Sequence, residues 1–156
     1  MGTRSTYRVI ERGEYEGKKW ERKIVLLYVQ FDGYPSGHPS ETAEWLASGT
    51  VVNGLGVNPD NKLLFNGAGC LAAQLVAKIK DGPGGAYLYP IQQRGKCGEY
   101  NVYDIIVNSD KTIEFIAYDV RRGGWDNKPV WFKKLYSGTP EGFKAYVKSR
   151  NNVGNR

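Results

Sequence analysis

Apolar runs, and stretches where apolar and polar residues alternate, predict strands over much of the chain. These stretches cover residues 6–11, 22–31, 86–91, 100–107, 112–120 and 129–136. Within the second stretch, every position from Ile24 to Val29 is apolar, which indicates a central strand covered on both faces. The polar segment 12–19 contains Gly13 and Gly17 and is predicted to be a hairpin loop. The two strands that it joins should therefore pair antiparallel.

Apolar residues at helical spacing predict three helices, over residues 41–48, 67–80 and 140–148. In the second of these, Leu71, Leu75 and Ile79 recur every four residues and therefore share one face of the helix. Ser40 precedes the first helix and is expected to cap its amino terminus. The Gly- and Asn-rich segment 50–62 is predicted to be a loop.

The order of these elements, two strands, two helices, four strands and a final helix, predicts the fold class. Hairpins dominate and strands do not alternate with helices, which favours an α+β fold over a parallel α/β fold. We expect a single domain over residues 1–150, with a largely antiparallel sheet and about three helices. Residues 151–156 are expected to form a frayed carboxy-terminal tail. A chain of this length can bury a sizeable core without disulfides or metals.

The composition is that of a globular protein with a basic surface. Lys and Arg number 22 against 16 Asp and Glu, which gives a net charge of +6. A positive charge keeps a small domain soluble, and this is the interpretation we favour. It also attracts polyanions, so nucleic-acid binding through the basic surface stays open as an alternative.

Several classes of protein do not fit the sequence. Cys70 and Cys97 form no CxxC pair and have no accompanying cluster of Cys and His, so no metal site is predicted. The polar start at Met1 does not resemble a signal peptide, and no apolar run approaches the roughly 20 residues that cross a bilayer. We therefore expect a cytoplasmic protein that does not associate with membranes and needs no cofactor.

The loop after the second predicted strand carries the strongest candidate for a functional site. Asp32, Ser36 and the only histidine, His38, lie close together on a segment stiffened by Pro35. Asp32 and His38 could form an acid/base pair, with Ser36 as a nucleophile. Asp and Ser in turns more often bond to the backbone, and rigid loops often bind partners. We therefore favour binding over catalysis. The predicted binding residues of this region are Arg4, Gln30, Asp32, Gly33, Tyr34, Ser36, Gly37 and His38.

A second candidate lies in the predicted loop 121–128. Arg121, Arg122 and Trp125 combine guanidinium groups, which bind phosphate, with an indole that stacks on a base. They are therefore candidate nucleotide-binding residues. The alternative is a solvated hairpin tip with Trp125 folded back on the sheet.

Three segments of the first half resemble a family of small proteins from bacteria, phages and large DNA viruses. In that family a Thr-Arg-Ser start, here Thr3 to Ser5, precedes a strand, and an Asp-Gly-Tyr-Pro-x-Gly-His loop, here Asp32 to His38, introduces a helix. The segment Ala43 to Leu46 also matches. The resemblance covers about the first 48 residues, and Pro39 stands where family members often have Gly. It implies an intracellular, phage-encoded accessory protein and marks Arg4 and the loop, but it supplies no activity.

Taken together, these observations favour a non-enzymatic binding protein. The expected partner is a host protein or a small phosphorylated ligand, held by the Asp32 to His38 loop and by nearby basic and aromatic residues. A small hydrolase or nucleotide-processing enzyme that uses Asp32 and His38 is the first alternative, and nucleic-acid binding is the second. The incomplete catalytic motif is the observation that disfavours an enzyme.

Overall fold

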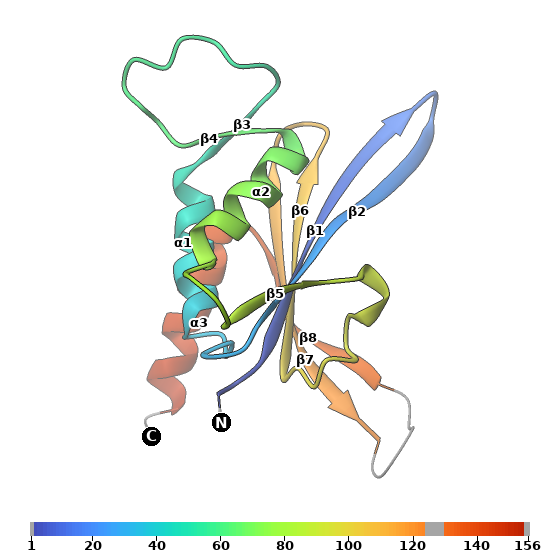
Figure 1. The fold of residues 1–156 in the computed structure, drawn as a ribbon, viewed down its shortest axis with the longest axis vertical. Helices are drawn as coiled ribbons and strands as arrows, with labels where there is room; N and C mark the ends of the chain where they lie inside the picture. Colours follow the sequence, from blue (N-terminus) through green and yellow to red (C-terminus); the bar gives the residue numbers. More distant parts are fainter. Residues whose placement is uncertain (1, 124–129, 155–156) are drawn as a thin grey trace.

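A six-stranded sheet is the centre of the computed structural model, which describes residues 2–123 and 130–154 (Figure 1). In spatial order its strands are β5 (Ala86–Tyr89), β2 (Lys18–Val29), β1 (Ser5–Tyr15), β6 (Asn101–Asn108), β7 (Ile113–Arg122) and β8 (Val130–Gly138). Neighbouring strands are antiparallel except for β1 and β6, which are parallel. The predicted α+β fold with a largely antiparallel sheet is confirmed.

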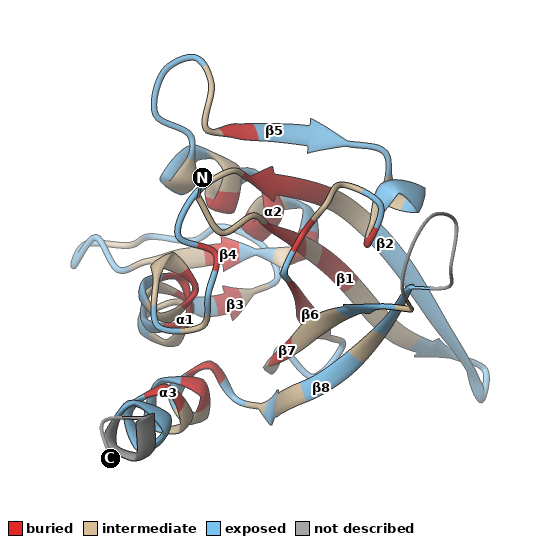
Figure 2. Ribbon diagram, turned by 90° about the horizontal axis from the view of Figure 1, so that it is seen from below, coloured by how far each residue is buried: buried red, intermediate tan, exposed pale blue. Residues whose placement is uncertain are grey.

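Three helices cover one face of this sheet, as Figure 2 shows. They are α1 (His38–Ser48), α2 (Gly67–Ile79) and α3 (Pro140–Gly154). Tyr7 and Val9 of β1 point toward the helices, because alternate residues of a strand share a face. Both are fully buried, in a cluster that includes Leu71 of α2 and Phe143 of α3. Burying each such side chain stabilises the fold by about 1.5–3 kcal/mol.

The opposite face of the sheet is partly covered by the segment that leads from β5 to β6. This segment contains the short 3₁₀ helix η1 (Ile91–Gln93), and it places Arg94 above Phe132 of β8, with the guanidinium carbon 4.4 Å from the ring centroid. Ile10, Ile106 and Ile116 form a small buried cluster on this face. We call this side of the sheet, opposite the three helices, the helix-free face.

The first hairpin is longer than its sequence indicates. The polar segment 12–19, predicted to be a loop, lies mostly within β1 and β2, and only Glu16 and Gly17 form the turn, both with positive φ. Strand β6 pairs with β1 only as far as Arg12, so the end of the hairpin projects beyond the sheet (Figure 1). Exposure of both faces there removes the apolar alternation that identifies a strand.

Two other predicted elements differ in detail. The predicted loop 50–62 begins with β3 (Thr50–Val52), which pairs in parallel with β4 (Leu64–Asn66) to make a separate two-stranded sheet. The strand predicted over residues 86–91 ends at Tyr89 as β5, and η1 begins at Ile91.

The helix ends also differ from the prediction. Helix α1 begins at His38 with Gly37 as its N-cap, so the prediction that Ser40 caps it is wrong. Pro39 lies in the first turn, where a missing N–H costs nothing. The helix predicted to end near Lys148 continues to Gly154.

Candidate ligand-binding site

The predicted binding residues gather at one end of the sheet. Ser5 is in register with Val29 of β2 and with Asn101 of β6, and Asn101 is in register with Asp119 of β7. Arg4, Gln30 and the end of β7 therefore lie at the same end. Trp125 falls outside the described residues.

The arginines at the end of β7 are exposed. Arg121 donates to Asp119 Oδ2 at 3.0 Å, so its charge already has a carboxylate partner. Arg122 is exposed at the last position of the strand. An exposed ion pair contributes at most about 1 kcal/mol, so the contact with Asp119 adds little to stability.

The Asp32 to His38 loop closes on itself through its backbone. Asp32 has φ of 56°, and its carbonyl accepts from the N–H of His38 at 3.1 Å. The N–H of Gly37 donates to the carbonyl of Tyr34 at 2.8 Å. The side chains of Asp32 and Ser36 are exposed to solvent.

Gly33 anchors this loop to the sheet. Its N–H donates to the carbonyl of Thr3 at 2.8 Å, and its carbonyl accepts from the buried Tyr103 hydroxyl at 2.7 Å. A Cβ at this position would lie 2.4 Å from Ser5 Oγ. The loop is therefore held directly against β1 by a residue that has no room for a side chain.

The imidazole of His38 points into the protein, on the helix-covered side of the sheet. Its Nδ1 lies 2.6 Å from the Tyr7 hydroxyl, which also bonds to Thr42 Oγ1 at 3.2 Å. Its Nε2 lies 3.5 Å from Ser5 Oγ. Burial lowers the pKa of His38 from 6.5 to about 4, although the charge of Asp32 acts in the opposite direction. The histidine is therefore neutral at pH 7. Burial also raises the pKa of Tyr7, its hydrogen-bond partner.

This arrangement does not assemble a nucleophile and a base. Among the residues that the structure describes, no hydrogen bond joins the side chains of Asp32, Ser36 and His38. Both ring nitrogens of His38 face core hydroxyl groups, whereas the hydroxyl of Ser36 faces solvent. A nucleophile must lie within hydrogen-bonding reach of its base, so in this geometry the loop is a structural clamp.

A pocket lies at the same end of the sheet, beside Arg4, on the helix-free face. It has a volume of about 210 Å³ and is lined by Gly2, Arg4, Tyr28, Gln30 and Phe31. Arg4 and Gln30, both predicted binding residues, thus meet in one hollow. Tyr28 and Phe31 were not predicted, because Tyr28 belongs to the apolar run of a central strand and Phe31 was placed at the end of that strand.

Gly98 and Tyr100 both lie against the guanidinium of Arg4. Its central carbon lies 5.7 Å from the centroid of the Tyr100 ring. A Cβ built on Gly98 would lie 3.3–3.4 Å from this carbon and from both terminal nitrogens. The near equality of these distances means that the guanidinium lies face-on to the backbone at Gly98, whose φ of 74° favours glycine.

Arg4 differs from five other arginines of the described residues in its charge environment. No Asp or Glu of the described residues forms an ion pair with Arg4, and its buried Nε, like that of Arg94, has no hydrogen-bond partner there. The arginines that do pair with carboxylates are Arg8, Arg12, Arg22, Arg94 and Arg121. An oriented guanidinium without a counter-charge is suited to bidentate binding of a phosphate or carboxylate.

Aromatic rings line the pocket beside this cation and pack against its wall. Tyr28 forms one wall of the pocket and stacks on Tyr89, with ring centroids 5.2 Å apart. Tyr87 completes this group of rings, with its centroid 6.4 Å from Tyr89 and 6.2 Å from Tyr28. Burial raises the pKa of Tyr28, and the positive charge of Arg4 opposes this increase. Phe31 is 53 % exposed although it lines the pocket.

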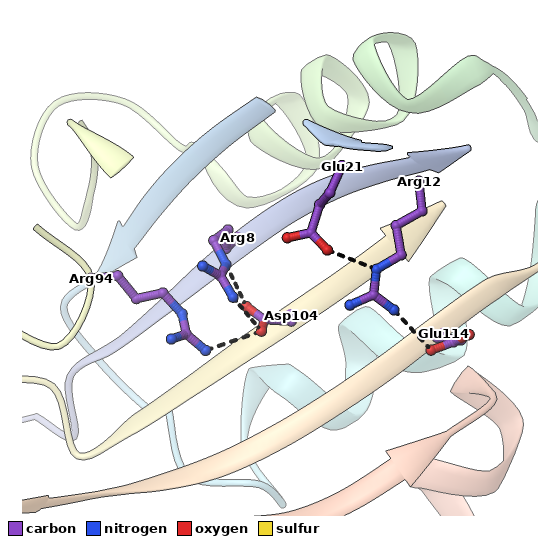
Figure 3. A network of polar contacts seen from close by, with 6 residues as sticks. All are labelled: Arg8, Arg12, Glu21, Arg94, Asp104 and Glu114. Atoms are coloured by element: carbon purple, nitrogen blue, oxygen red, sulfur yellow. Dashed lines mark hydrogen bonds and ion pairs between the residues drawn. The ribbon is translucent and has the colours of Figure 1, made fainter. Parts of the chain in front are cut away.

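A second arginine cluster lies further along the same face, and Figure 3 shows its ion pairs. Arg8 donates to both carboxylate oxygens of Asp104, at 2.9 and 2.8 Å, and Arg94 donates to Oδ2 of the same carboxylate at 3.0 Å. The side chain of Asp104 is 3 % exposed. Burial lowers the pKa of Arg94, and Asp104 counteracts this decrease. We call these three residues the Asp104 network.

Glu99 fixes the segment on which Arg4 rests. Its buried carboxylate accepts from the N–H groups of Gly95 and Cys97, both at 2.7 Å, and from Thr6 Oγ1 at 3.1 Å. A carboxylate with three donors is a strong organising centre for a loop. Sequence reasoning placed Glu99 outside any element and missed this role, since its partner on β1 is 93 positions away.

Comparisons with known proteins add no relative to this picture. The chain matches no protein-family model, no curated protein and no solved structure. In the described part of the chain, no group of His, Cys, Asp and Glu is arranged to hold a metal ion. None of the helices there combines the length and apolarity needed to cross a bilayer.

Proposed function

We propose that this protein is a non-enzymatic binding protein that captures a small phosphorylated ligand in the Arg4 pocket. The observation that carries the proposal is the state of Arg4: oriented by Tyr100 and Gly98, and without a carboxylate partner among the described residues. Ordering a long side chain costs conformational entropy. An arginine that is already ordered gives up less on binding, which favours affinity.

The loop contributes by positioning rather than by chemistry. Gly33 ties it to β1 and β6, and this tie fixes Gln30 and Phe31 at the pocket immediately before the loop. The alternative occupant of the same pocket is a carboxylate or phosphate group of a host protein. The resemblance of the first 48 residues supports a phage-encoded accessory role in a host cytoplasm as the setting of this proposal.

Calorimetric titration with pyrophosphate tests the proposal. We expect the wild-type chain to bind pyrophosphate, and Arg4→Ala to bind it at least about 10-fold more weakly, the loss typical of a charge-assisted hydrogen bond. The matched control is Arg22→Ala. Arg22 also stacks on an aromatic ring, 5.9 Å from the centroid of Trp20, but it already pairs with Glu11.

Equal binding by wild type and Arg22→Ala, with weak binding by Arg4→Ala, supports the proposal. Absence of binding by the wild type at millimolar pyrophosphate contradicts it. An equal loss in the two arginine variants also contradicts it, because the attraction would then be a general effect of net charge.

A further inference from the structure

We infer that the ligand of the Arg4 pocket is a nucleoside phosphate, with its phosphate on Arg4 and its base stacked on Phe31. This inference rests on the proposed function and specifies the class of ligand. The pocket pairs one cationic wall with two aromatic walls, Tyr28 and Phe31. A ligand that satisfies both kinds of wall needs an anionic group and a flat ring a short distance apart.

Phe31 has the features of a stacking platform. It is 53 % exposed, although large apolar side chains are usually buried. The ring packs closely against Gly2, where a Cβ would lie 2.3 Å from Phe31 Cδ1. The N–H of Gln30, the preceding residue, donates to the carbonyl of Gly85 at 2.8 Å and fixes the backbone. The ring is therefore held in place while part of its surface faces solvent.

The other wall differs from Phe31 in how far it is covered. Tyr28 is only 8 % exposed and already stacks on Tyr89. It therefore forms a closed wall of the pocket, whereas Phe31 offers an open ring face. Stacking on an aromatic side chain accepts any base, because every base has a π-face. The ring thus explains affinity for a base, whereas discrimination between bases requires a polar group.

Gln30 is the polar group that the pocket offers for discrimination. Gln30 lines the pocket together with Arg4, Tyr28 and Phe31. A carboxamide donates and accepts hydrogen bonds at once, and it can therefore contact a base edge or a ribose hydroxyl.

The size of the hollow limits what it holds. A volume of about 210 Å³ is below the roughly 300–1,000 Å³ of sites that enclose a whole drug-sized ligand. The hollow therefore encloses part of a nucleotide, and the rest lies outside it. The same chemistry is offered by a free mononucleotide and by one unit of a single strand of nucleic acid.

The test compares AMP with ribose 5-phosphate, which has the same phosphate and sugar but no base. Each is titrated into the full chain by calorimetry at constant ionic strength. We expect AMP to bind about 10-fold more tightly, as one base–aromatic stack implies. Phe31→Leu should abolish this preference and leave binding of ribose 5-phosphate unchanged. Tyr15→Leu, which removes an exposed ring at the far end of the β1–β2 hairpin, is the control and should keep the preference.

The possible outcomes separate the two proposals. If ribose 5-phosphate binds as tightly as AMP and both depend on Arg4, the nucleoside inference is wrong and phosphate capture stands. If neither binds and pyrophosphate also fails, the proposed function itself is wrong. Retention of the AMP preference by Phe31→Leu overturns the role of Phe31. A deoxythymidine decamer that binds more tightly than AMP, with a steep salt dependence, supports the nucleoside class and identifies a single strand as its source.

Discussion

Arg4, just before β1, and Arg8, within it, lie four residues apart and face the same side of one sheet, yet their surroundings are opposite. Arg8 shares the buried carboxylate of Asp104 with Arg94 and links β1, β6 and the segment before β6 (Figure 3). Arg4 is stacked on Tyr100, lines a pocket and has no carboxylate partner among the described residues. The residue type and the face of the sheet are the same, so the difference comes from the neighbours. Strand β6 supplies Asp104 to Arg8, whereas the crossing segment 90–100 supplies Gly98 and Tyr100 to Arg4.

This difference teaches how one segment can produce both stability and binding. Arg94 and Glu99, both from the crossing segment, bond to Asp104 and Thr6 on the sheet and so fix its path. The same path then brings Gly98 and Tyr100 against Arg4. In the Asp104 network two guanidinium groups share one buried carboxylate, although the buried Nε of Arg94 has no hydrogen-bond partner among the described residues. Arg4 is oriented by its neighbours but has no carboxylate partner there. The first should respond to mutation through stability and the second through binding.

The largest effect is expected from Asp104→Asn. It leaves two mostly buried guanidinium groups without their shared counter-charge, and breaking a buried pair in this way typically costs about 3–5 kcal/mol. Urea denaturation measures the free energy of unfolding. The control is Glu114→Gln, whose exposed contact with Arg12 at 3.9 Å should be worth less than about 1 kcal/mol. A loss for Asp104→Asn no larger than that of the control would show that the network is not a cross-link.

Lowering the pH should weaken the clamp behind the pocket. The pKa of His38 is lowered from 6.5 to about 4 in the folded protein, so the unfolded chain binds a proton at a higher pH than the folded chain does. The stabilisation is complete above pH 6.5 and is lost as the pH falls toward 4, by about 2–3 kcal/mol. Denaturation curves at several pH values should show this slope, and His38→Asn should reduce it. An equal slope in the variant would mean that other groups cause it.

A smaller loss is expected from Gly33→Ala, which tests the anchor of the loop. The new methyl group would lie 2.4 Å from Ser5 Oγ and 2.9 Å from the carbonyl of Thr3. Such overpacking typically costs about 1–3 kcal/mol. Gly69→Ala in α2 is the matched control, because its methyl group meets open space and alanine favours a helix by up to about 1 kcal/mol. If both variants are equally stable, the loop is free to move away from β1.

The smallest change in stability is expected from Arg4→Ala. The variant loses a stacking contact with Tyr100 but leaves no carboxylate unpaired, so the free energy of unfolding should change by less than about 1 kcal/mol. Urea denaturation without ligand measures this directly. A loss as large as that of Asp104→Asn would erase the distinction between the two arginines.

The sequence predicted the framework of the fold better than its connections. Apolar runs identified the strands and helices because periodicity is a local signal. This periodicity was misleading at residues 12–19, whose polar side chains predicted a loop. These residues lie in the part of the hairpin that projects beyond β6. The parallel pairing of β1 with β6, and the crossing segment between them, depend on contacts between residues more than 90 positions apart. No local pattern encodes these contacts.

The candidate site was found in part. The resemblance singled out Arg4 and the Asp32 to His38 loop, and the structure brings both to one end of the sheet. It also divides them between the two faces, with His38 against Tyr7 on one side and Arg4 with Gln30 on the other. Tyr28 and Phe31 were missed, because an aromatic residue in or next to an apolar strand is usually assigned to the core.

The most direct test of the account is the unfolding free energy of wild type, Arg4→Ala and Asp104→Asn, each with and without pyrophosphate at constant ionic strength. A ligand that binds only the folded chain stabilises it by about 2.7 kcal/mol at 100 times its dissociation constant. We predict that pyrophosphate stabilises the wild type, while Arg4→Ala starts at nearly the same stability and gains almost nothing. Asp104→Asn should start far lower. Equal stabilisation of the wild type and Arg4→Ala by pyrophosphate would contradict the claim that Arg4 is the anion-binding residue of this protein.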